Sequence, residues 1–401
     1  MDDVEVIQVS LGTDTVKAGV CGDDAPRLVM PSMVTERVGN QQPGIVYPDP
    51  AHPHVVPEGI PLMHRQRVDS WDGAKMMIES CYQQMDIPIR GGSCLMPVGI
   101  QTTLSDVAEL CRIGLEDLSL SSMAFSMESS LALYGNGRCT GLCVDIGHGG
   151  TQISSIYEGY KVCRDVWLPI GGLSVQDAYY QDLYPMAEDA RVRTDYRKMR
   201  EGAYRVNPQS SGNHHPNNHG NVSFCLAEDN TPTLAGTGPT LPMEVAYSDI
   251  FRPSRSLPDG VQVIDEWAVR QAGHTAAETL FAPHVDSQGV SQAVLDVLSR
   301  SDYDCKRDLL RNIVLVGGCT RVEGVPARIG HDVGAVYTKA EVKVVASTER
   351  QYSTWVGGSI EGSLTSFEGR CITRAAYEEQ GERLLIEKCP QFNEPDGSGN
   401  R

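Results

Sequence analysis

Two short segments of this chain share one pattern, and that pattern restricts what the chain can fold into. Residues 6–20 and 143–156 each contain an apolar, β-branched run, a polar residue, a glycine-containing turn and a second alternating run. Such a unit predicts a β-hairpin, and glycine lets the backbone N–H groups of a tight turn approach an anion. Two matching units predict a duplicated α/β domain that closes on a phosphate from both sides. The aligned positions are Ser10 with Asp145, Gly12 with Gly147, Asp14 with Gly149, and Lys17 with Gln152.

The charge balance limits the partners of the chain. Its 34 Lys and Arg against 52 Asp and Glu give a formal net charge of −18 over 401 residues. This predicts no nucleic-acid partner and no general attraction to anionic membranes. No apolar run is long enough to span a membrane, and the acidic start MDDVEV is not typical of a signal peptide. The 12 cysteines, many within apolar runs, predict reduced, buried thiols, and the spacing of Cys139 and Cys143 does not fit a zinc site.

The spacing of apolar residues predicts strands that alternate with helices. A third strand is expected at 28–34, and Ser70 or Asp72 is expected to cap the helix that follows. Residues 102–110 and 121–134 are also predicted to be helical. Further expected elements are a strand pair at 157–162, helices at 172–183, 187–206, 266–280 and 289–300, a strand at 313–316 before a Gly–Gly turn, a strand at 343–347 and a small-residue helix at 353–367.

Two segments differ from the rest in composition. Residues 35–66 are rich in Pro, Gly and His, which predicts an irregular surface excursion. Residues 207–240 are dominated by Asn, Ser, His, Gly and Pro, which is typical of a solvated loop. His214, His215 and His219 lie in this loop, and without a scaffold to hold ligands they do not predict a metal site.

Longer strings show that the chain resembles the actin and actin-related protein family. The resemblance covers almost all of residues 4–389 and is poor at 35–66 and 187–255. The strings are KAGVCGDDAPRLVMPS at 17–32, SLALYGNGRCTGLCVDIG at 130–147, IYEGY at 156–160, KRDLLRNIVLVGGCTRVEG at 306–324 and ERQYSTWVGGSIEGSLTSF at 349–367.

The resemblance implies an α/β, actin-like ATPase fold, with two RNase H-like domains around a nucleotide cleft that holds ATP or ADP with Mg²⁺. It makes the paired hairpins the two phosphate loops. The implied small lobe spans 1–135, with an upper insertion at 32–61, and the chain returns to it at 353–389. The implied large lobe spans 136–352, with an insertion at 172–288 that includes 207–240. Residues 390–401 are expected to form a disordered tail.

In the first loop, the chain departs from the family pattern. Ser10 stands where the family has an aspartate that holds the hydrated cation, and a hydroxyl does not supply the charge that attracts Mg²⁺. Asp14 replaces a glycine at the phosphate, so a carboxylate would face a polyanion. Gly12 is retained, Thr13 matches a serine that bonds the terminal phosphate, and Lys17 matches the phosphate-binding lysine.

The second loop keeps more of the family pattern. Asp145 matches the other aspartate, which holds the metal through water, and Gly147 and Gly149 match the turn glycines. His148 replaces an aspartate.

Two further positions concern the attacking water. Glu128 falls where actins have the glutamine that positions this water, and glutamate is chemically able to do the same. Gln152 replaces a histidine that lies near the water in the family.

The adenine end is only partly retained. Gly317 and Gly318 match the glycine pair beside the adenine, whereas Val322 and Gln351 replace a tyrosine and a lysine. The nearest candidates for the adenine-side Lys/Glu pair are Lys198 and Glu201. A purely structural interpretation stays open: the glycines would be kept for turns alone, and Lys17 could pair with Asp145 or Asp14 across an empty cleft.

Three functions remain open. The favoured one is a structural, non-filament-forming subunit of a cytoskeletal or motor-associated complex in the cytoplasm, with other protein subunits as partners, residual ATP binding and little hydrolysis. The second is an ATP-hydrolysing, filament-forming actin, which the changes in the loops argue against. The third is a nuclear actin-related subunit of a chromatin-remodelling complex, although the sequence has no basic targeting cluster.

Overall fold

The computed structural model describes residues 5–35, 44–45, 59–183, 222–225, 273–283 and 287–389. Several sequence predictions lie outside these residues: the helix at 187–206, most of the proline-rich segment 35–66, nearly all of the loop at 207–240 with its histidines, Lys198 and Glu201, and the tail at 390–401.

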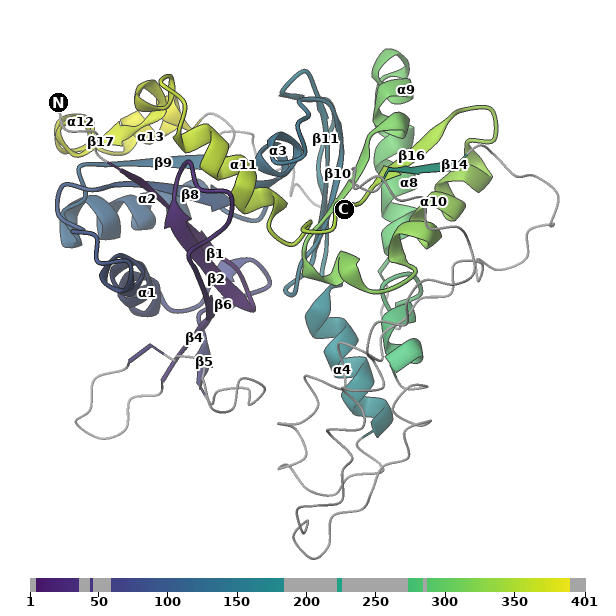
Figure 1. Cartoon of the computed structure of the whole chain (residues 1–401), viewed down its shortest axis with the longest axis horizontal. Coiled ribbons are helices and arrows are strands. Elements are labelled where there is room, and N and C mark those ends of the chain that lie inside the picture. Colours follow the sequence, from purple (N-terminus) through teal and green to yellow (C-terminus); the bar gives the residue numbers. More distant parts are fainter. Residues whose placement is uncertain are drawn as a thin grey trace, which may run out of the picture.

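Two mixed β-sheets form the centres of two lobes that lie side by side (Figure 1). The sheet of the small lobe has the strand order β17-β9-β8-β1-β2-β3, and that of the large lobe β12-β11-β10-β15-β16-β14, with β13 also paired to β11. In each sheet an antiparallel hairpin continues into parallel neighbours, through β1, β8 and β9 in one and through β10, β15 and β16 in the other. The repeated arrangement confirms the predicted α/β fold with two similar domains.

The strand bounds follow the predicted hairpins closely. In the small lobe they are β1 Val6–Leu11, β2 Thr15–Val20, β3 Leu28–Pro31, β8 Ser93–Val98, β9 Ser122–Met127 and β17 Ile372–Thr373. In the large lobe they are β10 Gly141–Ile146, β11 Thr151–Tyr157, β12 Tyr160–Lys161, β13 Val166–Leu168, β14 Val222–Cys225, β15 Ile313–Val316 and β16 Val342–Val345. Two small hairpins extend the small lobe, β4 Met33–Val34 with β5 Ile60–Pro61 and β6 Met63–His64 with β7 Arg67–Val68.

The register of the two hairpins confirms their predicted equivalence. Ser10 lies directly opposite Lys17 in the β1–β2 pair. Asp145 lies directly opposite Gln152 in the β10–β11 pair. The positions that align in sequence therefore occupy the same cross-strand places in the two lobes.

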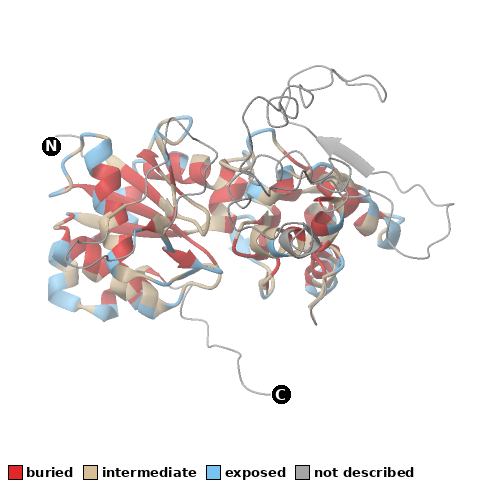
Figure 2. Ribbon diagram, turned by 90° about the horizontal axis from the view of Figure 1, so that it is seen from below, coloured by how far each residue is buried: buried red, intermediate tan, exposed pale blue. Residues whose placement is uncertain are grey.

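Helices cover both sheets, and each lobe has its own buried apolar core (Figure 2). In the small lobe α1 begins after Ser70, whose hydroxyl accepts a hydrogen bond from the Gly73 N–H at 3.1 Å, as the capping pattern predicts. The helices of the small lobe are α1 Trp71–Gln84, α2 Leu104–Cys111, α12 Arg374–Gln380 and α13 Glu382–Lys388. Those of the large lobe are α4 Gly172–Leu183, α8 Val290–Arg300, α9 Tyr303–Arg311 and α10 Val325–Val336.

Three sequence predictions about local structure are wrong. The end of segment 35–66, predicted to be irregular, contains β5 and β6, which pair with β4 and β7 in two small hairpins. Residues 121–134 are not one helix: the first half is β9, and only α3, Glu128–Tyr134, is helical. Strand β9 lies parallel to β8 and is buried at Met123–Ser126, so its apolar residues do not alternate with polar ones. Within the predicted loop 207–240, β14 adds a parallel strand to the edge of the large sheet beside β16, where backbone pairing satisfies otherwise unpaired groups.

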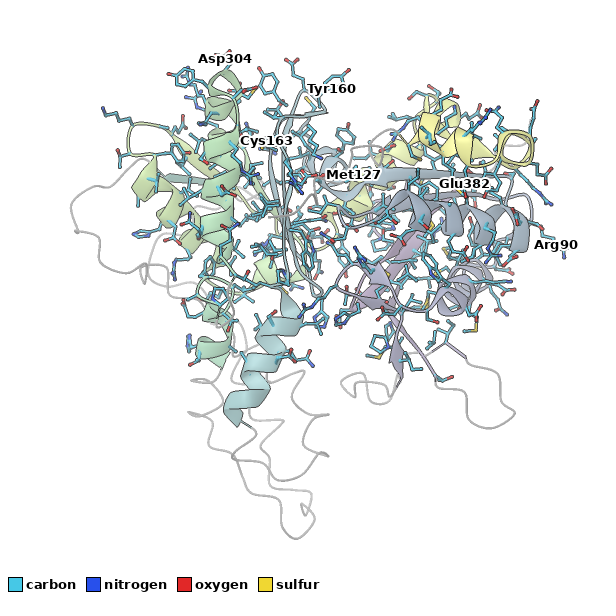
Figure 3. All side chains as sticks on the ribbon, turned by 180° about the vertical axis from the view of Figure 1, so that it is seen from behind. Arg90, Met127, Tyr160, Cys163, Asp304 and Glu382 are labelled. Carbon is cyan, nitrogen blue, oxygen red and sulfur yellow. The ribbon has the colours of Figure 1, made fainter. Side chains whose placement is uncertain are left out.

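The two lobes meet along a pair of helices. Helix α3 packs against α11, Ser353–Gly362, between the two sheets (Figure 1). Met127, the last residue of β9, lies at this junction in the view from behind (Figure 3), directly before Glu128. A Cβ on residue 357 would overlap the carbonyl oxygen of Leu131, so the backbones of α11 and α3 touch where the sequence places a glycine. The predicted close packing of this small-residue helix is confirmed.

None of the helices in the described part of the chain is both long enough and apolar enough to cross a bilayer.

Candidate nucleotide site

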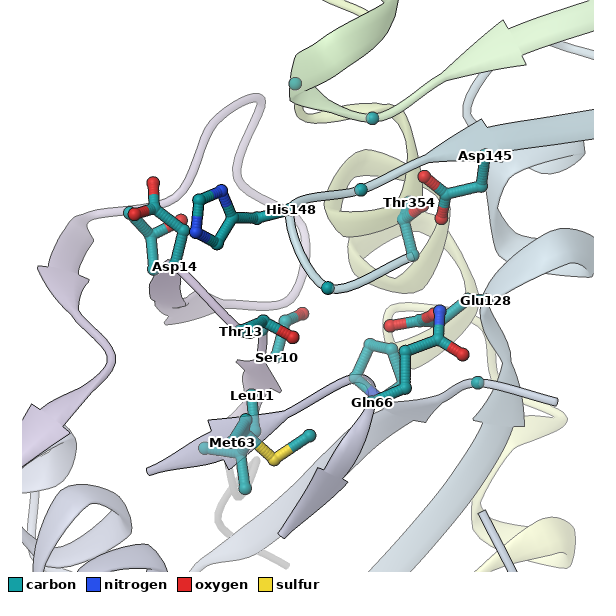
Figure 4. Close-up of a pocket in the computed structure, with 18 of the residues that line it drawn as sticks. Ser10, Leu11, Thr13, Asp14, Met63, Gln66, Glu128, Asp145, His148 and Thr354 are labelled. Atoms are coloured by element: carbon teal, nitrogen blue, oxygen red, sulfur yellow. The ribbon is translucent and has the colours of Figure 1, made fainter. Parts of the chain in front are cut away.

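A cavity of about 500 Å³ lies between the lobes, and the loops of both hairpins line it (Figure 4). It brings together the residues that the sequence predicted to bind nucleotide or water, apart from the candidates Lys198 and Glu201, which lie outside the described residues. The residues that it brings together are Gly12, Thr13, Lys17, Glu128, Asp145, Gly147, Gly149, Gly317 and Gly318. Their roles remain predictions, but their convergence on one cavity is a feature of the fold.

The two loops touch each other at a glycine. A Cβ on residue 149 would overlap Oγ1 of Thr13, so only glycine lets the second loop approach the first. In the first loop a Cβ on residue 12 would lie 2.7 Å from the carbonyl oxygen of Thr15. Both glycines therefore keep the backbone close to the cavity, as a phosphate-binding turn requires.

Gly317 is required for a different reason. Its φ of 91° lies in the left-handed region, where side chains are strained, and a Cβ there would overlap Oδ1 of Asp145. The end of β15 thus closes directly on the carboxylate of the second loop.

The amide of Gln152 joins the two lobes at the floor of the cleft. Its Nε2 donates to Oε2 of Glu128 at 2.6 Å and to Oδ2 of Asp145 at 3.0 Å. Its Oε1 accepts from the backbone N–H of Ile100, in the small lobe, at 3.2 Å. The Ile100 donor fixes which end of the amide faces the carboxylates. The sequence identified Gln152 only as a replacement for a histidine and did not predict this role.

Glu128 and Asp145 share one desolvated region, so their protonation is linked. Burial, followed by the charge of Asp145, raises the pKa of Glu128 to about 7, although the Gln152 amide and Lys17 act in the opposite direction. Burial also raises the pKa of Asp145, against the effects of Gln152 and Lys17. Two acids this close do not ionise independently in an empty cleft.

Lys17 is the cation that faces these acids. Burial lowers the pKa of its ammonium, while the charges of Asp145, Glu128 and Asp14 raise it. Within the described part of the chain no ion pair joins Lys17 to Asp145, so this form of the purely structural interpretation is not supported. The lysine is placed to neutralise an anion that enters between the loops.

The residues fit phosphate groups better than they fit a divalent cation. Two glycine loops and a lysine suit a polyphosphate. A cation would find one carboxylate, Asp145, whose Oδ2 already accepts from Gln152, and the hydroxyl of Ser10, which accepts from Gln8 Nε2 at 3.3 Å. No group of three or more His, Cys, Asp or Glu side chains among the described residues is arranged to hold a metal ion. Any Mg²⁺ here would depend on water and phosphate oxygens.

The predicted adenine end of the cavity is lined by a different set of side chains. Arg321, which the sequence analysis did not single out, lines the cavity beside Val322 and Gln351. Its Nη1 donates to Oε1 of Gln351 at 2.5 Å. An arginine–glutamine hydrogen bond thus borders the part of the cavity that Val322 and Gln351 line.

The sequence analysis also did not single out Gln66 and Gly99, which line the cavity beside Glu128. Gln66 lies in the turn between β6 and β7, and no local motif distinguishes it. Gln66 becomes a candidate functional residue only because the fold places it opposite Glu128.

Two equivalent α/β lobes around one cleft, with a glycine hairpin from each, define a protein with an actin-like ATPase fold. The chain belongs to the actin family: residues 1–390 match the family model described as Actin. It is similar to "Actin-related protein 4" of Oryza sativa subsp. indica, with 25% identity over 440 aligned residues covering 97% of this chain and 99% of the relative. The protein of that name in Arabidopsis thaliana is 26% identical over 460 aligned residues, with the same coverage.

Proposed function

We propose that this actin-related protein is a structural subunit of a cytoskeletal or motor-associated assembly, with a nucleotide bound in its cleft and little hydrolysis. The observation that carries the proposal is the charge arrangement at the phosphate end. Lys17 and two touching glycine loops favour a polyphosphate, whereas the cation would be held by Asp145 without a second carboxylate at Ser10. A site of this kind favours the nucleotide over the metal.

Nucleotide binding should depend only weakly on Mg²⁺. We expect the affinity for ATP to change by less than about threefold when Mg²⁺ is removed, because a single carboxylate attracts the hydrated ion poorly. The Ser10→Asp/Asp14→Gly variant should bind more tightly and gain at least about a tenfold dependence on Mg²⁺, since it adds one acid for the ion and removes another from the phosphate. Isothermal titration with ATP, with and without Mg²⁺, measures both.

Ser10→Ala is the matched control, because it changes the same position without adding charge. It should leave the dependence on Mg²⁺ as in the wild type. A wild-type protein that binds ATP only with Mg²⁺ would contradict the proposed defect of the cation site, and one that binds no nucleotide in either condition would contradict nucleotide binding itself.

Self-assembly should be absent in the isolated protein. Segment 35–66 contains Pro43, Pro48, Pro50, Pro53, Pro57 and Pro61. Proline fixes φ and removes an N–H donor, which limits the strand pairing that this segment can offer to a neighbouring subunit, although Ile60–Pro61 pair with Met33–Val34 within the chain. A filament repeats one heterologous contact on every subunit, so one unsuitable surface stops its growth. We expect no sedimenting polymer and no helical filaments by electron microscopy at concentrations where actin polymerises.

The polar segment 207–240 offers a direct check on this expectation. Filaments of the intact chain would refute it, while filaments that form only after deletion of 207–240 would identify this segment as the block. The subunit role itself is tested by purifying a tagged copy with its partners from cells. The location of that copy distinguishes the cytoplasmic assembly from the nuclear, chromatin-remodelling alternative.

A further inference from the structure

The turn that carries Gln66 is strained and packs against the second loop. In the β6–β7 hairpin His64 pairs with Arg67, which leaves Arg65 and Gln66 as a two-residue turn. Both have positive φ, 47° and 68°, in a turn type that normally uses Asn-Gly. The Cα of Arg65 lies 3.1 Å from the position of a Cβ on residue 149. Strain of this kind persists where the surrounding structure imposes it, and it occurs often at functional sites.

Two acceptor oxygens converge on a space that a glycine leaves open. A Cβ on residue 99 would lie 3.0 Å from Oε1 of Gln66 and 3.2 Å from Oε2 of Glu128. Figure 4 shows the amide end of Gln66 turned toward the Glu128 carboxyl at the end of the cavity. Oε1 of Gln66 is buried and has no hydrogen-bond partner among the described residues. A buried acceptor without a donor is costly, so a donor belongs in this space.

We propose that Gln66 and Glu128 hold a water molecule between them, in the space beside Gly99, and present it to the terminal phosphate of a bound nucleoside triphosphate. Gln66 is then a water-positioning residue that comes from the small lobe. A water fits because it donates two hydrogen bonds, one to each oxygen, and keeps a lone pair for the phosphorus. Glu128 Oε2 also accepts from Gln152 at 2.6 Å, which fixes the carboxyl group and leaves room for a second donor.

The chemical step balances with the triphosphate and this water alone. The water oxygen forms a bond to the terminal phosphorus, and the bond from that phosphorus to the bridging oxygen breaks. The nucleoside diphosphate leaves with the electron pair of that bond, and the proton of the water passes to the Glu128 carboxylate. The inference rests on the proposed nucleotide binding. It implies that hydrolysis is slow because Ser10 does not hold the cation, and not because the attacking water is badly positioned.

The first test is structural and does not depend on turnover. A high-resolution crystal structure of the nucleotide-free chain should show an ordered water within hydrogen-bond distance of both Gln66 Oε1 and Glu128 Oε2. In Gly99→Ala the methyl group should remove it, and the fold should persist because the nearest atoms are flexible ends of side chains. An empty space in the wild type, or a water that contacts only one of the two oxygens, would overturn the proposal.

The second test uses a background in which hydrolysis should appear. Phosphate release by Ser10→Asp/Asp14→Gly should exceed that of the wild type at least about tenfold, and adding Gly99→Ala or Gln66→Asn should remove at least about nine-tenths of the gain. Asparagine suits the positive φ of residue 66 better than glutamine but ends one carbon short. Its variant should therefore fold at least as stably and still lose activity, which a merely structural role does not predict. Gln101→Asn, outside the lining of the cavity, is the matched control.

Affinity for ATP, measured in the same variants, separates this inference from the proposed function. Loss of nucleotide binding in the Ser10→Asp/Asp14→Gly background would contradict the proposed function. Intact binding with no gain in hydrolysis, or with a gain that survives both Gln66→Asn and Gly99→Ala, would contradict the water site alone.

Discussion

Replacing Gly357 with alanine is expected to lower the free energy of unfolding by more than about 3 kcal/mol, because a methyl group has no room at this helix crossing. The added Cβ would overlap the Leu131 carbonyl oxygen and lie 2.5 Å from the carbon of that group and 3.0 Å from Gly135 N. These are backbone atoms, so relief requires α11 and α3 to move apart. Denaturant unfolding, followed by circular dichroism, measures the loss.

Gly369→Ala provides the control for this prediction. No atom lies within 4 Å of the Cβ it would add, so its effect should stay within about 0.5 kcal/mol of the wild type. If the two variants were equally stable, the close contact of the two helices would not be a feature of the protein in solution.

Replacing Glu128 with glutamine should remove a pH dependence of stability from the nucleotide-free protein. The pKa of Glu128 is raised to about 7 by burial and by the charge of Asp145, from 4.5 in a solvated chain, and Lys17 is the facing cation. Between these values the folded state binds more protons than the unfolded state, so stability falls as the pH rises from 4.5 to 7. The loss approaches about 3 kcal/mol at most, less where solvent reaches the carboxyl group. Urea unfolding from pH 4.5 to 8, without nucleotide or Mg²⁺, tests this.

The variant should be more stable than the wild type at pH 8, and the difference should shrink toward pH 5. Glu79→Gln, on the exposed face of α1, serves as the matched control and should retain the wild-type pH profile. Equal slopes for Glu128→Gln and the wild type would show that the carboxyl group is solvated rather than buried against Asp145.

The sequence alone was sufficient to predict the features that depend on residues close together in the chain. The hairpins could be aligned because glycine and alternation fix their turns and register, and the structure places Ser10 opposite Lys17 and Asp145 opposite Gln152 accordingly. The start of α1 was predictable because Ser70 caps it. The glycines of α11 indicated a close contact before its partner was known.

Features set by distant parts of the chain were not predictable in this way. Strand β9 was predicted as a helix because its buried residues do not alternate with polar ones; it pairs in parallel with β8 and antiparallel with β17. Gln66 carries no motif, and its turn lacks the Asn-Gly signature that positive φ values favour. The link from Gln152 to Ile100 joins residues from different lobes, so no spacing along the chain announces it.

The matched registers of the two hairpins have a consequence for how such a cleft can arise. A symmetric dimer of a single ancestral lobe would present the same pair of side chains from both sides, and like charges would face each other across the ligand. Fusion of two copies into one chain lets each copy change alone. In this chain one copy carries hydroxyl and ammonium groups, Ser10 and Lys17, and the other a carboxylate and an amide, Asp145 and Gln152. Gene fusion thus permits a charged side chain in one copy where the other copy has a neutral one, which a homodimer cannot provide.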